Sequence, residues 1–213
     1  MRIGIVGAGR MGSGLGKLLG AAGHEIVYSF SRSPEKLARL ASETGPAARA
    51  GTPAEAAAAD VVILTVRRND LDEALAQTGD LVGKLVIDVT NPMDDADEEL
   101  AIGFSTSGGE ELAARTGARV VKAFNTVPSE LLHAGPHRLP QRAAVCFCGD
   151  DDGAKQVAAR LIRDAGFDAV DVGPLRSSRY LEPMAMLVAH VAYEGPTPEI
   201  GYRFVSVDAA VDR

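Results

Sequence analysis

The chain has 213 residues, of which 46% are hydrophobic and two are cysteines, and its net charge is −7. This length can bury the core of one domain, or of one domain with an extension, and a negative charge without clustered Lys and Arg argues against a nucleic-acid partner. No apolar run reaches membrane-spanning length and no signal peptide precedes the first apolar run, so we expect a cytoplasmic protein.

The first predicted strand, Ile3–Val6, is followed at once by a glycine-rich turn, Gly7-Ala8-Gly9-Arg10-Met11-Gly12, and then by helix formers up to residue 23. Each glycine has a separate function. Gly7 permits the tight turn, Gly9 lets the backbone approach a pyrophosphate, and Gly12 lets the helix pack against the strand. Phosphates bind the N–H groups at such a helix N-terminus, so the segment predicts a dinucleotide site.

Apolar runs and helical segments alternate along the rest of the chain. The further predicted strands are 25–30, 61–66, 85–89, 119–124, 143–148 and 169–172. The further predicted helices are 34–44, the alanine-rich stretch from 53, 70–76, 110–115, 151–165 and 178–193. This pattern predicts an α/β fold of Rossmann type, a doubly wound and mostly parallel sheet with a short C-terminal helical extension. We divide it into a dinucleotide-binding core, 1–125, and a segment, 126–213, that continues the sheet and closes a cleft for a second substrate.

The two cysteines, Cys146 and Cys148, lie two positions apart in a predicted strand and therefore on one face of it. A reduced pair in the core explains them better than a redox or metal site. Since no spacing of His, Cys and carboxylates along the chain suggests a metal, none is predicted.

The end of the second predicted strand indicates which dinucleotide binds. NAD enzymes place an Asp or Glu there, about 20 residues past the glycines, to bind the ribose 2′-hydroxyl. No acid lies between Ile26 and Pro34, whereas Ser31 and Arg32 can hold a 2′-phosphate, with Lys36 one helical turn further on. A guanidinium binds phosphate in a bidentate manner and a hydroxyl donates one more bond, so we predict NADP(H) rather than NAD(H).

Later strand ends are expected to complete the site, because ligands bind at the carboxyl ends of parallel strands. Thr90, Asn91 and Pro92 follow one predicted strand and would border the nicotinamide ribose, although Asn-Pro also starts many turns.

With these residues placed, the chain resembles the family of NADP oxidoreductases that depend on coenzyme F420, a deazaflavin. The resemblance extends over nearly the whole length. Its segments are Gly7–Gly14, Gly23–Val27, Ser31-Arg32 with Lys36, Val62–Val66, Ala123–Pro128, Cys148–Asp152, Val172–Leu175 and Ser178-Arg179. The related oxidoreductase domain of transmembrane ferric reductases has a similar asparagine version of Phe124-Asn125-Thr126.

The resemblance implies NADP contacts at the glycine-rich turn, a 2′-phosphate site and a nicotinamide side. The residues concerned are Ala8, Gly9, Arg10 and Met11, then Ser31, Arg32 and Lys36, and finally Val66 and Ser129. It also implies that the deazaflavin lies between the core and the C-terminal segment, and it favours a homodimer.

Two positions depart from the family pattern, and both border the expected site of the second substrate. The family has Pro and an aromatic residue where this chain has Arg67-Arg68, and its deazaflavin enzymes have histidine where this chain has Asn125. Arg67, Arg68 and Lys122 could instead attract the phosphate and carboxylate groups of a deazaflavin, or the arginines could be solvated loop residues.

The implied reaction passes hydride between NADP(H) and coenzyme F420, which needs no strong acid or base from the protein. No catalytic residue is therefore assigned, and Asn125 borders the expected hydride-transfer site. Glu182, Tyr193 and the other polar residues near the last helix are expected to pack or to lie on the surface. The alternatives are an NADPH-dependent reductase of another acceptor, such as a flavin, carbonyl or imine, and a non-catalytic NADPH-binding sensor.

Overall fold

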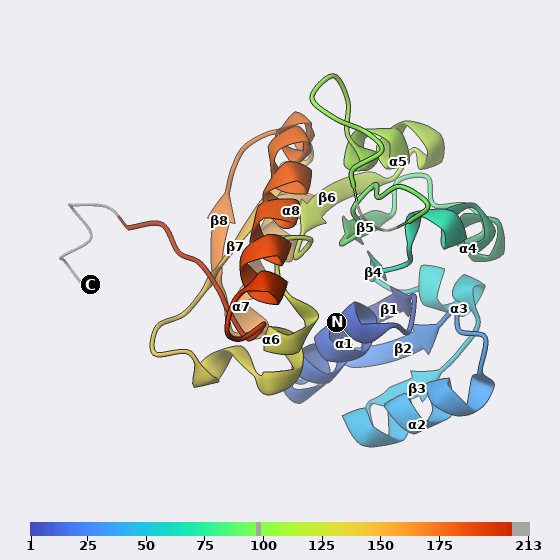
Figure 1. The fold of residues 1–213 in the computed structure, drawn as a ribbon. Helices are drawn as coiled ribbons and strands as arrows, with labels where there is room; N and C mark the ends of the chain where they lie inside the picture. Colours follow the sequence, from blue (N-terminus) through green and yellow to red (C-terminus); the bar gives the residue numbers. More distant parts are fainter. Residues whose placement is uncertain (97–98, 206–213) are drawn as a thin grey trace.

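The structure, a computed structural model, describes residues 1–96 and 99–205, and over these residues the chain forms an eight-stranded sheet in the order β3-β2-β1-β4-β5-β6-β7-β8 (Figure 1). The strands are β1 (Arg2–Val6), β2 (Glu25–Ser29), β3 (Ala48–Ala50), β4 (Val61–Leu64), β5 (Leu85–Asp88), β6 (Arg119–Ala123), β7 (Ala144–Gly149) and β8 (Asp168–Asp171). The α-helices are α1 (Arg10–Ala21), α2 (Pro34–Thr44), α3 (Pro53–Ala57), α4 (Leu71–Thr78), α5 (Gly108–Thr116), α6 (Ser129–Ala134), α7 (Asp152–Asp164) and α8 (Ser178–Glu194). The last part of the predicted C-terminal segment, 206–213, lies outside the described residues.

This strand order confirms the predicted Rossmann-type, doubly wound α/β fold. Strands β2 and β3 extend the sheet on one side of β1, and β4, β5 and β6 extend it on the other, all in parallel. Strand β7 then runs antiparallel to β6, and β8 runs parallel to β7. The order reverses beside β1, which is where open α/β sheets bind ligands at the carboxyl ends of their strands.

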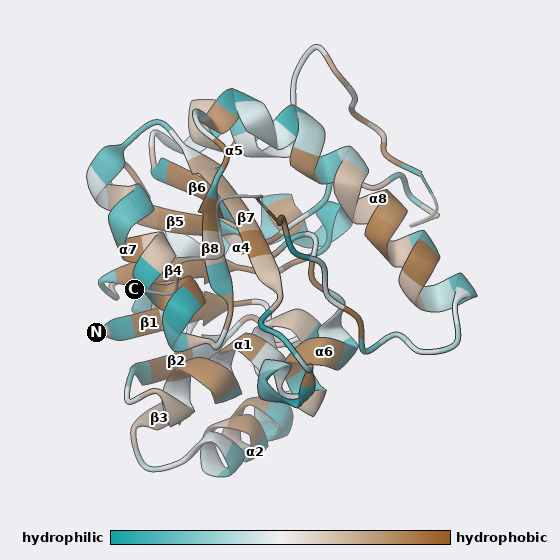
Figure 2. Ribbon diagram, turned by 90° about the vertical axis from the view of Figure 1, so that its left-hand side faces the viewer, coloured by the Kyte–Doolittle hydropathy of each residue, from teal (hydrophilic) through white to brown (hydrophobic). Residues whose placement is uncertain are grey.

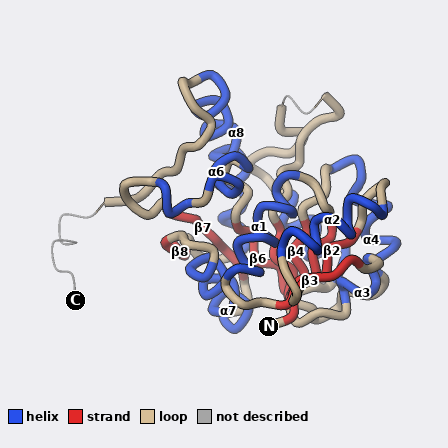
Figure 3. The backbone as a smooth tube through the Cα atoms, turned by 90° about the horizontal axis from the view of Figure 1, so that it is seen from below, coloured by secondary structure: helices blue, strands red, loops and turns tan. Residues whose placement is uncertain are grey.

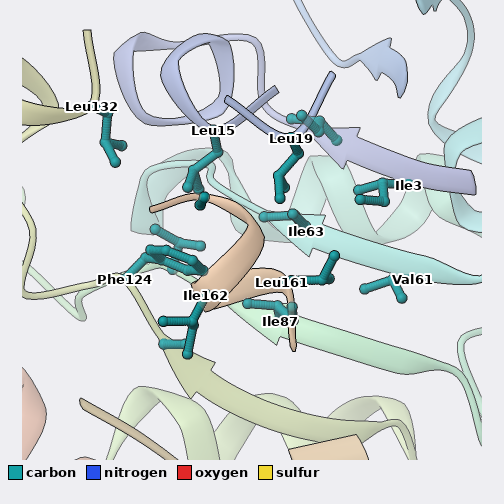
Figure 4. Packing of buried hydrophobic residues seen from close by; sticks show 14 of the residues in the cluster. Ile3, Leu15, Leu19, Val61, Ile63, Ile87, Phe124, Leu132, Leu161 and Ile162 are labelled. Carbon is teal, nitrogen blue, oxygen red and sulfur yellow. The ribbon is translucent and has the colours of Figure 1, made fainter. Parts of the chain in front are cut away.

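Helices cover both faces of the sheet, because successive strand residues point to opposite sides. One apolar cluster joins the sheet to α1, α2, α6 and α7, and in Figure 4 Leu15 and Leu19 of α1 reach toward Ile3 and Ile63 of the strands. A second cluster joins the opposite face to α3, α4 and α5. The sheet is therefore buried on both sides, and polar side chains inside it need partners.

Local sequence explains several element boundaries. The Ser33 hydroxyl accepts a bond of 3.2 Å from the backbone N–H of Lys36 and starts α2, while Thr52 forms a capping box at the start of α3. Helix α3 lies very close to β1, since a Cβ at Gly4 would overlap the carbonyl oxygen of Ala56.

Two short elements were not predicted. Strand β3 has three residues at the edge of the sheet, too few for a recognisable alternation. Helix α6 lies in a stretch for which no helix was predicted, and it carries His133. The strand predicted over 61–66 ends at Leu64, because Thr65 and Val66 turn into the edge where the candidate site lies.

The predicted last helix is confirmed, with Pro183 inside its first turns. Helix α8 packs on part of β7 through Leu181. Hydrophobic residues recur along this helix (Figure 2), which stands out from the body of the fold (Figure 3). The exposed members are Tyr180, Leu187, Val191 and Tyr193. Cys146 and Cys148 are buried free thiols, as expected for a reduced core pair. In the part of the chain that the structure describes, no helix is long and apolar enough to cross a membrane.

Candidate functional site

A cavity of about 600 Å³ lies at the carboxyl ends of the strands around the reversal point. Its lining combines the glycine-rich turn after β1 with the loops after β2 and β4 and with polar side chains of α4. The predicted cofactor residues in the lining are Gly7, Ala8, Gly9, Ser31, Arg32, Lys36, Val66 and Arg67. Segments that are far apart in the sequence thus meet at one edge.

Two glycines of the turn, Gly7 and Gly12, are required by its geometry. Gly7 has φ +113°, and a Cβ there would lie 2.8 Å from Thr65. The Thr65 hydroxyl donates to the Gly7 carbonyl oxygen at 2.6 Å, which fixes the turn from the next strand. A Cβ at Gly12 would overlap that same carbonyl oxygen, whereas a Cβ at Gly9 would meet nothing within 4 Å among the described residues. Gly12 therefore serves packing, whereas the space beside Gly9 is open among the described residues.

The N-terminus of α1 carries no compensating group among the described residues. Helices α2, α3, α5 and α7 each begin with a side-chain cap. Helix α1 begins at Gly9 with no side-chain cap and no acid in its first turn. Its unsatisfied N–H groups and the positive end of its dipole suit a phosphate.

The end of the cavity at β2 is cationic and exposed. Phe30 has a positive φ of 56°, so the chain turns sharply into the Ser31–Ser33 loop. The Arg32 side chain is 93% exposed, and its Nη2 lies 3.6 Å from Asp70 Oδ1. Asp70 was not predicted, and it competes with any anion for this guanidinium.

A second, smaller cavity of about 150 Å³ adjoins the first and shares Arg67 with it. It is lined by Arg68, Asn91 and Pro92 together with residues of α4 and α5. The predicted Asn91 and Pro92 therefore lie beside the main cavity rather than in its lining.

Asn91 and Asn125 form a pair at this edge. The Asn125 Nδ2 donates to Asn91 Oδ1 at 3.0 Å and to the Leu181 carbonyl oxygen at 3.0 Å. In return, Asn91 Nδ2 donates to the Asn125 carbonyl oxygen at 3.1 Å. The Asn125 Oδ1 atom is buried and has no hydrogen-bond partner among the described residues.

Arg10 and Ser129 lie outside the lining of the main cavity. Arg10 Nε donates to Ser129 Oγ at 3.1 Å, and its Nη2 pairs with Glu130 Oε1 at 2.5 Å. Burial would raise the pKa of Glu130, but hydrogen bonds from its backbone, Tyr193 and Ser129 outweigh this and lower that pKa. Met11 is half-buried and packs on the core. These contacts tie α1 to α6 and α8.

The expectation for Lys122 was wrong, because this lysine does not reach solvent to attract an anion. Its side chain is 0% exposed, and Nζ lies 2.8 Å from Asp88 Oδ2 and 2.7 Å from Glu182 Oε1. Burial by itself lowers the pKa of Lys122, but the two carboxylates more than offset this and the pKa lies above its ordinary value. Glu182 is likewise buried.

Comparison with known proteins finds a matching family model and several relatives. Residues 2–92 match a family model described as NADP oxidoreductase coenzyme F420-dependent. Metalloreductase STEAP3 of Rattus norvegicus is 31% identical over 190 residues, which make up 87% of this chain and 36% of that protein. The chain thus spans little more than a third of the length of the curated relatives that it matches.

Two solved structures extend over most of the chain. A hypothetical protein, SMa0349, from Sinorhizobium meliloti is 33% identical with a TM-score of 0.74, covering 84% of this chain and 87% of that one. A candidate F420-dependent NADP reductase from Arthrobacter sp. FB24 has a TM-score of 0.85 at 24% identity, covering 96% of this chain and 99% of that one. The second likeness concerns the fold alone.

Proposed function

We propose that this chain, of which residues 2–92 match the model of the family of NADP oxidoreductases that depend on coenzyme F420, transfers hydride between NADP(H) and a deazaflavin of the F420 type. The observation that carries the NADP half is the cavity at the reversal point, with the open space at Gly9 and the cations at the end of β2. The deazaflavin half rests on the family and on the length of the resemblance.

The residues of the cavity fit NADP(H). The uncapped start of α1 would hold the pyrophosphate, and Ser31, Arg32 and Lys36 would hold the 2′-phosphate. Val66 and the Asn91–Asn125 pair would border the nicotinamide end. When bound, NADPH supplies the hydride, and the protein contributes binding and orientation.

The second candidate is an NADPH-dependent reductase of another acceptor. The two departures from the family pattern favour this candidate. Arg67 and Arg68 line the smaller cavity, and Asn125 is hydrogen-bonded to Asn91, which also lines it. The sequence predicts no proton donor at this edge of the sheet, which suits an acceptor that takes hydride directly better than a carbonyl or an imine.

The decisive experiment follows NADPH oxidation by the purified protein with and without oxidised coenzyme F420, using the deazaflavin absorbance. We expect saturable, NADPH-dependent bleaching that is lost in Arg32→Ala. Free FMN is assayed in parallel. Turnover with FMN but not with coenzyme F420 would refute the deazaflavin proposal and support the second candidate. NADPH binding without turnover of either acceptor would support a non-catalytic NADPH-binding sensor.

Gly9→Ala separates binding from folding. We expect the affinity for NADPH to fall at least about tenfold, because the added methyl group occupies the space that the pyrophosphate needs. The melting temperature should not change, since φ at Gly9 is −76° and a Cβ there meets nothing within 4 Å among the described residues. Titration calorimetry and thermal unfolding measure the two quantities.

Gly103→Ala is the matched control, because a Cβ at Gly103 also meets nothing within 4 Å of the described residues and this glycine is not in the cavity lining. If Gly9→Ala binds NADPH as tightly as Gly103→Ala does, the pyrophosphate does not lie at this turn.

A further inference from the structure

A buried charge cluster lies beside the candidate site, outside either cavity lining. Lys122 of β6 is opposite Asp88 of β5 in the sheet register. Its Nζ also contacts Glu182 of α8 and donates to the Thr90 carbonyl oxygen at 2.6 Å. One ammonium thereby connects two neighbouring strands, the loop after β5 and the last helix.

The same cluster holds the start of α5. Glu182 Oε2 accepts from the N–H of Gly108 at 3.0 Å, and Oε1 accepts from the N–H of Gly109 at 3.1 Å. Asp88 Oδ1 accepts from the backbone and the hydroxyl of Thr90, at 2.9 and 2.8 Å. Every carboxylate of the cluster therefore fixes a backbone segment as well as the ammonium.

Burying three charges is an inefficient way to gain stability. The desolvation of such groups consumes much of their mutual attraction, and apolar side chains of similar volume stabilise a core as well or better. The cluster instead fixes the positions of the segments that it joins.

The segments that it joins carry the Asn91–Asn125 pair. Asn91 directly follows Thr90, whose carbonyl oxygen is held by Lys122. Asn125 donates to the carbonyl oxygen of Leu181, the residue before Glu182. The Oδ1 of Asn125 is buried and has no hydrogen-bond partner among the described residues, and leaving such an acceptor unpaired costs about 1–3 kcal/mol.

We propose that Lys122, together with Asp88 and Glu182, is a positioning residue that sets the Asn91–Asn125 pair at the nicotinamide end of the cofactor site. The inference rests on the proposed function, because that function places the nicotinamide at this edge. It predicts that the cluster affects binding of the nicotinamide end of the cofactor and does not affect binding of the adenosine end.

Two ligands separate these ends. NADPH and 2′-phospho-ADP-ribose share the adenosine, the 2′-phosphate and the pyrophosphate, and 2′-phospho-ADP-ribose lacks the nicotinamide. Dissociation constants for both are measured by calorimetry on the wild type and Lys122→Met, which removes the charge and keeps the side-chain length. The fluorescence of bound NADPH reports how firmly the nicotinamide ring is held.

In Lys122→Met we expect the dissociation constant of 2′-phospho-ADP-ribose to stay within about twofold of the wild-type value. The preference for NADPH over this fragment should fall at least about tenfold, and the fluorescence gain on binding should be lost. Glu182→Gln keeps a side-chain oxygen and the Lys122–Asp88 pair, so it should show a smaller change in the same direction even if Lys122→Met does not fold. Lys155→Met, in the ion pair with Asp171 on β8, should match the wild type.

A purely structural role is indicated, and the proposal overturned, if both ligands weaken equally or if neither changes in the two variants. A wild-type protein that binds both ligands equally also overturns it, because the nicotinamide is then not held at the asparagine pair. A wild-type protein that binds neither ligand refutes the proposed function itself, which is a distinguishable result.

Discussion

Arg32→Glu is expected to reverse the coenzyme preference of this protein. The affinity for NADPH should fall by roughly tenfold to a hundredfold, because a charge-assisted bond to the 2′-phosphate is replaced by repulsion. The affinity for NADH should rise, since an acid at the end of the second strand can accept from the ribose 2′-hydroxyl. Competitive titration with both reduced coenzymes measures the preference.

Arg39→Glu is the matched control for this substitution. Arg39 lies on α2, the helix that follows the loop of Arg32. It pairs with Glu43 on the surface and is not in the cavity lining. It makes the same change in net charge, so any loss that it causes is the long-range contribution. If Arg32→Glu and Arg39→Glu change the preference equally, or if the wild type prefers NADH, then Arg32 does not read the 2′-phosphate.

Asp70 affects how the result is interpreted. In the structure its carboxylate lies 3.6 Å from Arg32 Nη2, so the guanidinium has a partner before any cofactor arrives. A phosphate has to compete with this exposed pair, which is worth little in water. The sequence did not indicate Asp70, because its contact with Arg32 is made across the cavity by the helix that follows β4.

The parts of the fold that sequence predicts well are those fixed by local chemistry. The glycine-rich turn is one, because backbone sterics at Gly7 and Gly12 allow nothing larger. The buried run of β4 is another, since strands covered on both faces read as continuous apolar segments. Short elements such as β3 and α6 carry too few residues for a period to be recognised, and the packing of their neighbours decides them.

The buried cluster shows the opposite case. Lys122 reads locally as a surface residue of a strand, and Glu182 reads as a surface residue of a helix. Their burial depends on a sheet register that pairs Lys122 with Asp88 and on a helix that arrives 60 residues later. Aligning the two strands offered a signal, since each carries a charged residue at its fourth position, Asp88 in β5 and Lys122 in β6.

Lys122→Met should be among the most destabilising substitutions in the core. It leaves the carboxylates of Asp88 and Glu182 buried together without their cation, and breaking a buried ion pair in this way costs about 3–5 kcal/mol. Since a domain is stable by only about 5–15 kcal/mol, the midpoint of urea unfolding should fall well below that of the wild type. Circular dichroism at neutral pH measures this. Lys155→Met, at a lysine whose carboxylate partners Asp152 and Asp171 are exposed to solvent, should unfold much closer to the wild type.

The dependence on pH distinguishes loss of charge balance from loss of packing. The pKa of Lys122 is raised, so in the wild type its contribution is fully present below the ordinary lysine value of about 10.4 and is lost as the pH rises through the raised value. Lys122→Met has no ammonium to lose, so the difference in stability between the wild type and this variant should shrink as the pH rises from 8 to about 11. A loss that is the same at both pH values would mean that the methylene packing of Lys122, and not its charge, holds β5, β6 and α8 together.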